Sequence, residues 1–318
     1  MVYITAHPVS DPYELASAIH CTLRGDTNAP LTAMINYVPS AFAALSNMVD
    51  NNEYHEQWRT YQSVSLHEMT HALGFNAYLA PYFESVTLER PAIITKNHEF
   101  VNSKGKHYKV NKQYIQTPNV LAYVKDHFGC DAMPGAELED IGGLGTAGNH
   151  WKAAVFGEEL MLGYSQGYAP ITGLTLALLK DTGWYTVHES KDVKPLVFGL
   201  KKGCDFALKP CSDTTWGFDG YWEITNSKPG CSATRSGVGL SQVWVYPTVL
   251  PTQYQHFEDG TWGAQNGPVF DYCLFNSPEV VDNSGSSYYC LDTSRKPNQY
   301  GTNLSSTEMR QYSSTIQS

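Results

Sequence analysis

Residues 67–75 read H-E-M-T-H-A-L-G-F, and this stretch decides the fold. On a helix, residues four apart share one face, so the imidazoles of His67 and His71 can both bind one zinc ion. Glu68 points beside that face, where it can hold a water molecule and take its proton as a general base. The same spacing arises by chance in surface helices, but an apolar helix face and the helix-ending Gly74 favour a zinc site.

The residue pattern alone does not decide which side chain is the third ligand of such a site. H-E-x-x-H-x-x-G resembles the start of the metzincin signature, in which a third His stands three residues after the glycine. Here that position is Ala77. Either a glutamate such as Glu84 or Glu89 completes the site, or a His beyond a long insertion does. The histidines downstream are His98, His107, His127 and His150.

These four histidines differ in their surroundings. His98 and His107 lie in a polar stretch typical of exposed loops, and His127 lies in a predicted helix, where a structural role is favoured. His150 follows a glycine-rich segment whose backbone can approach a metal closely. His150 therefore leads as the third ligand, by a small margin.

Hydrophobic periodicity and turn residues predict the other elements. Strands are expected at residues 1–6 and 31–38, and helices at 41–48 after an N-cap at Ser40, 53–73, 120–128 and 171–179. The stretch 76–149 reads as irregular, with a solvated loop at 104–112 and a glycine-rich loop at 141–148, and 150–163 as a turn with a short helix. The composition changes after Tyr185, which places a domain boundary near residue 188.

Composition narrows the class of protein. The 318 residues carry a formal net charge of −10 with no clustered basic run, which argues against a nucleic-acid surface. Only 16% of residues are charged and 21 are Tyr, which favours an extracellular location. Seven cysteines without a C-x-x-C pair predict disulfides, with at least one cysteine left over. Neither a secretion signal nor a membrane-spanning run is expected, and a monomer is favoured.

Several segments, in the same order, resemble the leishmanolysin family of surface metalloproteases. They are H-E-M-T-H-A-L-G-F (67–75), H-F-G-C (127–130), G-A-E-L-E-D-I-G-G-L-G-T-A-G-N-H-W (135–151), E-E-L-M (158–161) and T-L-A-L-L-K-D-T-G-W-Y (175–185). The resemblance implies an α+β, metzincin-like catalytic domain, with a twisted sheet and the active-site helix above a mostly helical lower subdomain. This domain is expected at residues 1–187, with an insertion at about 77–148. A smaller domain, containing cysteines and rich in strands and loops, is expected at 188–318.

The family pattern also implies a site and an activity. It makes His67, His71 and His150 the ligands of one Zn²⁺, and Glu68 the catalytic base and acid of an endopeptidase. Substrates are expected to be proteins or peptides lying extended across the cleft. The protein is expected to be secreted or held at the cell surface.

Three departures from the family pattern matter. Leu176 stands where metzincins place a methionine beneath the zinc; its similar volume predicts that zinc binding survives. By resemblance, Cys21 pairs with an upstream cysteine, and the family's secretion signal, pro-segment and first strands have no counterpart here. The cysteines are also fewer than is typical of the family. Leu176 and the short N-terminal part motivate the rival hypothesis of a catalytically inactive relative that serves adhesion or binding.

Four further residues receive structural roles. Glu158 and Glu159 are expected on a helix surface, in preference to a role in orienting a ligand histidine. Asp181 and Trp184 are expected to serve packing and helix ending.

Overall fold

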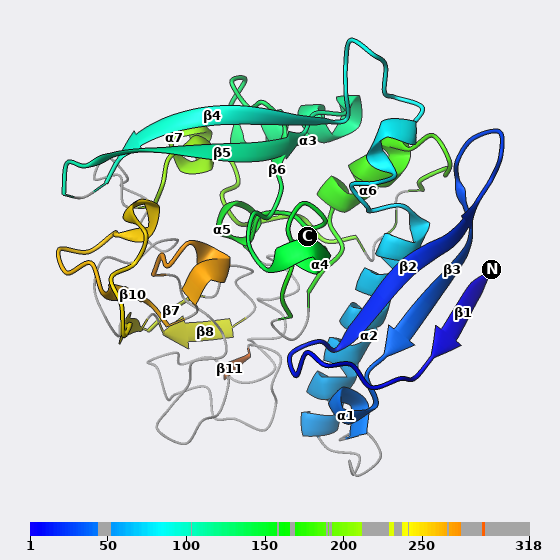
Figure 1. The fold of residues 1–318 in the computed structure, drawn as a ribbon, viewed down its shortest axis with the longest axis horizontal. Coiled ribbons are helices and arrows are strands. Elements are labelled where there is room, and N and C mark those ends of the chain that lie inside the picture. Colours follow the sequence, from blue (N-terminus) through cyan, green and yellow to red (C-terminus); the bar gives the residue numbers. More distant parts are fainter. Residues whose placement is uncertain are drawn as a thin grey trace.

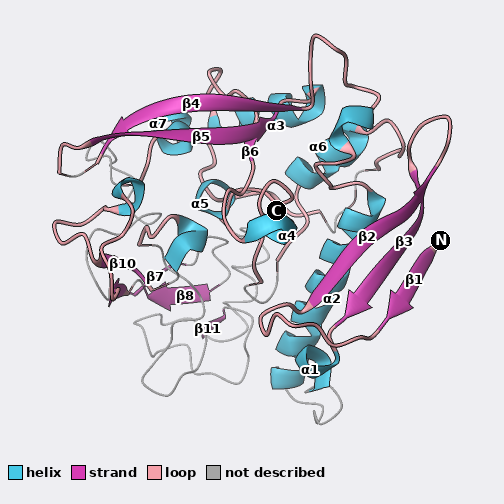
Figure 2. Ribbon diagram, in the orientation of Figure 1, coloured by secondary structure: helices cyan, strands magenta, loops and turns pink. Residues whose placement is uncertain are grey.

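The structure of the chain is a computed structural model, drawn in Figures 1 and 2. It describes residues 1–43, 52–102, 104–157, 159–165, 169–188, 190, 193–211, 229–231, 237–240, 242–265, 267–274 and 288–289. Within these residues, helices and four small sheets are mixed along the chain. The predicted mixture of helices and sheets is therefore confirmed, whereas the metzincin architecture and the division into two domains stay predictions.

The first sheet and helix α2 (Asn52–Leu73) form one layer pair, at the right of Figure 1. The sheet has the order β1-β3-β2, with β1 (Val2–Thr5) parallel and β2 (Ala16–Leu23) antiparallel to β3 (Pro30–Tyr37). Alternate residues of β3 face α2, so Ala33 and Ile35 are buried while Met34 is exposed. Both predicted strands are confirmed, and β2 is an additional one.

Helix α2 carries the H-E-M-T-H stretch and matches the prediction at 53–73. It ends at Gly74, whose φ of +135° is one that L-residues rarely adopt. A Cβ atom there would also lie 2.9 Å from the Trp184 ring. Gly74 is therefore required both by its backbone and by its neighbour, and Trp184 packs as predicted.

The stretch predicted to be irregular contains a long hairpin. Strands β4 (Ile93–Val101) and β5 (His107–Ile115) pair antiparallel, and β6 (Ala136–Glu137) joins β5. The solvated loop predicted at 104–112 is wrong, because β5 begins at His107. Lys, Asn and Gln side chains on the exposed face of the hairpin hid its alternating pattern.

Two helices cover the main core beyond the hairpin. Helix α3 (Pro118–Phe128) contacts α6 (Gly173–Asp181), and both match predicted helices. Asp181 is buried at the end of α6 and accepts hydrogen bonds from the backbone N–H groups of Asn119 and Val120. It thereby satisfies two donors that the start of α3 leaves free.

The short helices differ in detail from the predictions. Helix α1 spans Pro39–Phe42, so it begins at the proline and not after a Ser40 N-cap, and residues 44–48 of the predicted helix lie outside the described residues. The loop predicted at 141–148 contains a helix of four residues, α4 (Gly143–Thr146). The short helix predicted after His150 is confirmed as α5 (Ala153–Phe156).

The last third of the chain has small elements. They are α7 (Gly203–Leu208), β7 (Pro229–Cys231), β8 (Gly237–Leu240), β9 (Val243–Val245), β10 (Trp262–Ala264), β11 (Tyr288–Tyr289) and the 3₁₀ turns η3 (Thr252–Tyr254) and η4 (Gly267–Phe270); a further turn, η2, spans Ala80–Tyr82. Among the described residues no helix is both long and apolar enough to cross a bilayer.

Two disulfides join described cysteines, as the composition predicts. Cys130 pairs with Cys204, and Cys211 pairs with Cys273, whereas Cys21 is free and exposed. The first disulfide crosses the boundary predicted near residue 188. Ring contact between Tyr164 and Phe270 crosses it too.

We expect the Cys130–Cys204 disulfide to be a main constraint on the unfolded chain. It closes a loop with a sequence separation of 74. Disulfides of this kind typically add about 2–4 kcal/mol to the free energy of unfolding. Replacing both cysteines by serine should lower the free energy of unfolding by that amount in a urea titration. A double variant as stable as the wild type would contradict this expectation.

Candidate metal centre

Three histidines from distant parts of the chain meet at one point. The Nε2 atoms of His67 and His71, one helical turn apart on α2, are 3.0 Å from each other. The Nε2 atom of His150 lies 3.0 Å from that of His67 and 3.1 Å from that of His71. The structure therefore brings together the three histidines that the resemblance singles out.

Backbone carbonyls fix the tautomer of each ring. Nδ1 of His67 lies 2.7 Å from the Leu160 carbonyl oxygen, and Nδ1 of His71 lies 2.7 Å from that of Phe75. Nδ1 of His150 lies 2.9 Å from the Thr146 carbonyl oxygen. A carbonyl only accepts hydrogen bonds, so each Nδ1 must carry the proton. All three Nε2 atoms then present lone pairs to the same point.

Three lone pairs this close repel one another unless a cation lies between them. Nitrogens 3.0–3.1 Å apart share a common point at about 2 Å from each, the length of a Zn–N bond. An all-imidazole set suits zinc and related transition metals better than magnesium or calcium, which prefer oxygen ligands. The cluster fits a metal with three protein ligands, the number found in catalytic zinc sites.

The surroundings keep the rings neutral and ready to bind a cation. Burial, followed by the neighbouring His71 and His150, lowers the pKa of His67 well below its ordinary value. Burial also lowers the pKa of His71, and it lowers that of His150 to about 3. Neutral imidazole is the form that binds metals, so acid should release a bound ion.

Glu68 lies on α2 next to His67 and is buried, with 6% of its surface exposed. Burial and the negative charge of Glu14 raise the pKa of Glu68 to about 8. A buried carboxyl group with a shifted pKa beside a potential metal site is typical of a functional residue.

The chain reaches His150 through a segment tied down on both sides. The Glu139 N–H donates to the His150 carbonyl at 2.9 Å, and the Trp151 N–H donates to the Met161 carbonyl at 2.9 Å. Gly163 lies so close that a Cβ atom there would overlap Thr146. The glycine lets two loops meet behind the imidazole of His150.

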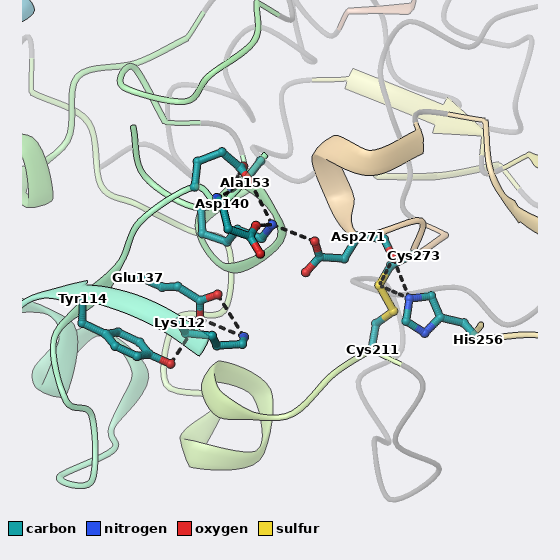
Figure 3. Close-up of polar contacts among 11 residues, drawn as sticks. Lys112, Tyr114, Glu137, Asp140, Ala153, Cys211, His256, Asp271 and Cys273 are labelled. Carbon is teal, nitrogen blue, oxygen red and sulfur yellow. Dashed lines mark hydrogen bonds and ion pairs between the residues drawn. A yellow bond between two sulfur atoms is a disulfide. The ribbon is translucent and has the colours of Figure 1, made fainter. Parts of the chain in front are cut away.

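A buried ion-pair network begins two residues after His150, and Figure 3 labels two of its carboxylates, Asp140 and Asp271. The Lys152 ammonium, in a residue only 1% exposed, lies 2.8 Å from Glu139, 2.5 Å from Asp140 and 2.7 Å from Asp271. Burial opposes its charge, but Asp271, Glu139 and Asp140 hold the pKa of Lys152 well above its ordinary value. Asp271 belongs to the last third of the chain, so this network joins that region to the segment of His150.

The other ligand candidates lie elsewhere. His98 lies on β4 and is partly buried, with Nε2 3.0 Å from the Tyr114 hydroxyl oxygen, and His107 is exposed on β5. His127 is buried on α3, where its Nε2 lies 2.8 Å from the Phe198 carbonyl oxygen, a structural role as predicted. Glu84 and Glu89 are exposed and are not among the described residues that gather at the cluster.

Of three buried residues around the cluster, sequence reasoning named Glu159 alone and favoured an exposed position for it. Glu159 is 1% exposed and lies outside the helices, so its placement on a helix surface is wrong; Glu158 lies outside the described residues. Lys152 and Met161 were not singled out. Met161 is fully buried, next to Leu160 and paired with Trp151. The E-E-L-M segment of the family resemblance was the one signal that pointed to Glu159 and Met161.

The chain is similar to known proteins over most of its length. A family model described as Leishmanolysin matches residues 1–318. The leishmanolysin-like peptidase of Caenorhabditis briggsae is 29% identical over 329 residues, covering 86% of this chain and 47% of that protein. The leishmanolysin-like peptidase of Drosophila melanogaster is 28% identical over 305 residues, covering 82% of this chain and 43% of that protein. The leishmanolysin of Leishmania major is 31% identical over 292 residues, covering 90% and 42%.

The chain spans less than half the length of these curated relatives. The match of the family model nevertheless extends over all of its residues. The chain belongs to the leishmanolysin family.

Proposed function

We propose that the protein is a zinc-dependent endopeptidase of the metzincin type. His67, His71 and His150 hold one Zn²⁺, and Glu68 is the general base and acid. The observation that carries this proposal is the convergence of three unprotonated Nε2 atoms beside a buried carboxyl group. Family membership supports it.

The residues of the chain divide the chemistry among them. When bound, the zinc ion polarises the scissile carbonyl and lowers the pKa of the attacking water. Glu68 would be ionised beside a cation held by the three histidines, because the positive charge would oppose the effect of burial on its pKa, and it could then act as a base. Glu68 then takes the proton of the water and passes it to the leaving amine.

An apolar floor beneath the site is the third part of the proposal. The resemblance assigns it to Leu176, which is partly exposed on α6. Met161 is better placed, since it is fully buried and follows Leu160, whose carbonyl oxygen lies next to Nδ1 of His67. We therefore assign the floor to Met161, which leaves the Leu at position 176 without consequence for zinc binding.

The proposal extends to substrate and location. Among the described residues β2 is an outer strand of the first sheet, paired with β3 alone, and it contacts α2, so an extended peptide can pair with its other edge. Protein and peptide substrates therefore fit the site. The two disulfides support a secreted or cell-surface location. Intact His67, Glu68 and His71 speak against the inactive, adhesive alternative.

Metal analysis of the purified chain tests the proposal directly. We expect one zinc ion per chain and cleavage of an unstructured protein that chelator abolishes and added zinc restores. A chain that takes up no zinc from excess zinc, or cleaves equally well in chelator, would overturn the proposal.

Replacing His150 by Ala tests the ligand set. Loss of an outer partner of a zinc ligand costs 10–100-fold in affinity, so loss of a ligand should cost more than about 100-fold. Zinc affinity is measured by competition with a chromophoric chelator. The matched control is His98→Ala, since His98 lies on the hairpin and bonds with Tyr114. Unchanged affinity in His150→Ala would assign the third ligand elsewhere.

A further inference from the structure

The buried carboxylate of Glu159 lies at the centre of a hydrogen-bond network behind the histidine cluster. It accepts from the Met161 N–H at 2.6 Å and from the Thr175 hydroxyl at 2.7 Å. It also accepts from the hydroxyl and the N–H of Thr172, at 3.1 and 3.4 Å. All four partners are neutral donors, and an ionised carboxylate can accept from all of them at once.

The first branch of this network leads to His67. The Met161 N–H donates to the Glu159 carboxylate. The N–H of the intervening residue, Leu160, donates to the Pro170 carbonyl at 2.9 Å. These two bonds fix the peptide whose carbonyl oxygen accepts from Nδ1 of His67 at 2.7 Å. The orientation of the His67 ring therefore depends on a backbone segment that Glu159 holds in place.

The second branch leads to His150. The Thr175 hydroxyl donates to Glu159 and accepts from Nε1–H of Trp151 at 3.1 Å. The Trp151 N–H donates to the Met161 carbonyl at 2.9 Å. Trp151 is fully buried and directly follows His150, so its indole and its backbone are both held by groups that bond to Glu159.

The third branch of the network connects Glu159 to the start of α6. Thr172 is the N-cap of α6, where its hydroxyl oxygen accepts from the Leu174 N–H at 3.2 Å and its proton goes to Glu159. The start of a helix favours a negative charge, which adds to the stability of the ionised carboxylate. One side chain thus joins the start of α6 to the segments of two histidines.

We propose that Glu159 is a positioning residue of the metal centre, which sets the His67 and His150 rings at the spacing that a zinc ion requires. This inference rests on the proposed function for its metal, but its geometry belongs to the chain itself. Glutamine at position 159 has the same shape, but its NH₂ group must face an N–H or O–H donor on at least one side. Repulsion between donors would displace the 159–161 segment and with it the Leu160 carbonyl.

The test compares Glu159→Gln with Asp181→Asn. Asp181 is also buried and accepts from backbone N–H groups, but those belong to α3 and not to the histidine segments. Both variants should lose stability in a urea titration. Only Glu159→Gln should lower zinc affinity, by 10–100-fold, as removal of outer partners of zinc ligands does. Affinity is measured above the pKa of about 7 to which burial raises the Glu159 carboxyl group.

Two further measurements keep the test decisive. Thr175→Val removes the hydroxyl that joins Glu159 to Trp151 and leaves the bonds from Glu159 to Met161 and Thr172 in place, so it should lower zinc affinity even if Glu159→Gln fails to fold. In the metal-free protein, ¹⁵N NMR of the imidazoles should show His67 protonated on Nδ1 in the wild type and a mixture of tautomers in Glu159→Gln. This second readout needs no metal.

The outcomes separate the two proposals. A wild type without zinc overturns the proposed function, and the His67 tautomer then decides the role of Glu159. If the wild type binds zinc and Glu159→Gln and Thr175→Val bind it equally tightly, Glu159 is not a positioning residue. An equal loss of affinity in Asp181→Asn overturns the inference as well, because it would show general destabilisation.

Discussion

Replacement of Glu68 by Gln is expected to lower kcat by about 10³-fold while one zinc ion stays bound. The amide has nearly the same shape as the carboxyl group, so the positions of His67 and His71 on α2 should not change. It cannot take a proton from water, and the proton-transfer step therefore loses its base. Cleavage of a fluorogenic peptide gives kcat and KM, and metal analysis of the same sample gives the zinc content.

The matched control for this variant is Glu89→Gln. Glu89 is exposed and does not gather with the histidines, so the control should keep both zinc and activity. It also tests the two-His-plus-Glu hypothesis, in which Glu89 would be a ligand. If Glu68→Gln retains more than a tenth of the activity, the general base is another group.

Replacement of Lys152 by Met is expected to lower the free energy of unfolding by about 3–5 kcal/mol. Lys152 and Glu139 are 1% and 2% exposed, and removal of the ammonium leaves the carboxylates of Glu139 and Asp271 without a buried counter-ion. The cost is that of uncompensated buried charge, since methionine fills nearly the same volume. Denaturant titration followed by Trp fluorescence measures it.

An exposed ion pair supplies the comparison for Lys152. The ammonium of Lys201 lies 2.8 Å from Asp126, but the two side chains are 56% and 85% exposed. Lys201→Met should therefore cost far less stability than Lys152→Met. Similar losses in the two variants would show that burial does not govern the strength of the Lys152 network.

The elements that sequence analysis predicted are those with strong local patterns. Helices α2, α3 and α6 combine helical spacing with a glycine at or just after their ends, at Gly74, Gly129 and Gly183. The β4–β5 hairpin was missed because polar side chains cover its outer face. Its pairing depends on long-range contacts that no local window contains.

The metal centre also has parts that local sequence patterns predict and parts that depend on long-range contacts. Spacing on one helix was enough to bring His67 and His71 together, because four residues make about one turn. His150 led only by a small margin on residues alone, and family resemblance was needed to select it. Glu159 and Lys152 read as ordinary charged residues, because the donors and carboxylates that pair with them come from elsewhere in the chain.

The bond between Lys152 and Asp271 also orders events during protein synthesis. The ribosome completes all three histidines well before it reaches codon 271, so the growing polypeptide holds the ligands while one of the anions that neutralise Lys152 is still missing. The segment behind His150 can reach its final charge balance only after Asp271 has left the exit tunnel. The ion pairs behind His150 are therefore complete only once the last third of the chain has been synthesised.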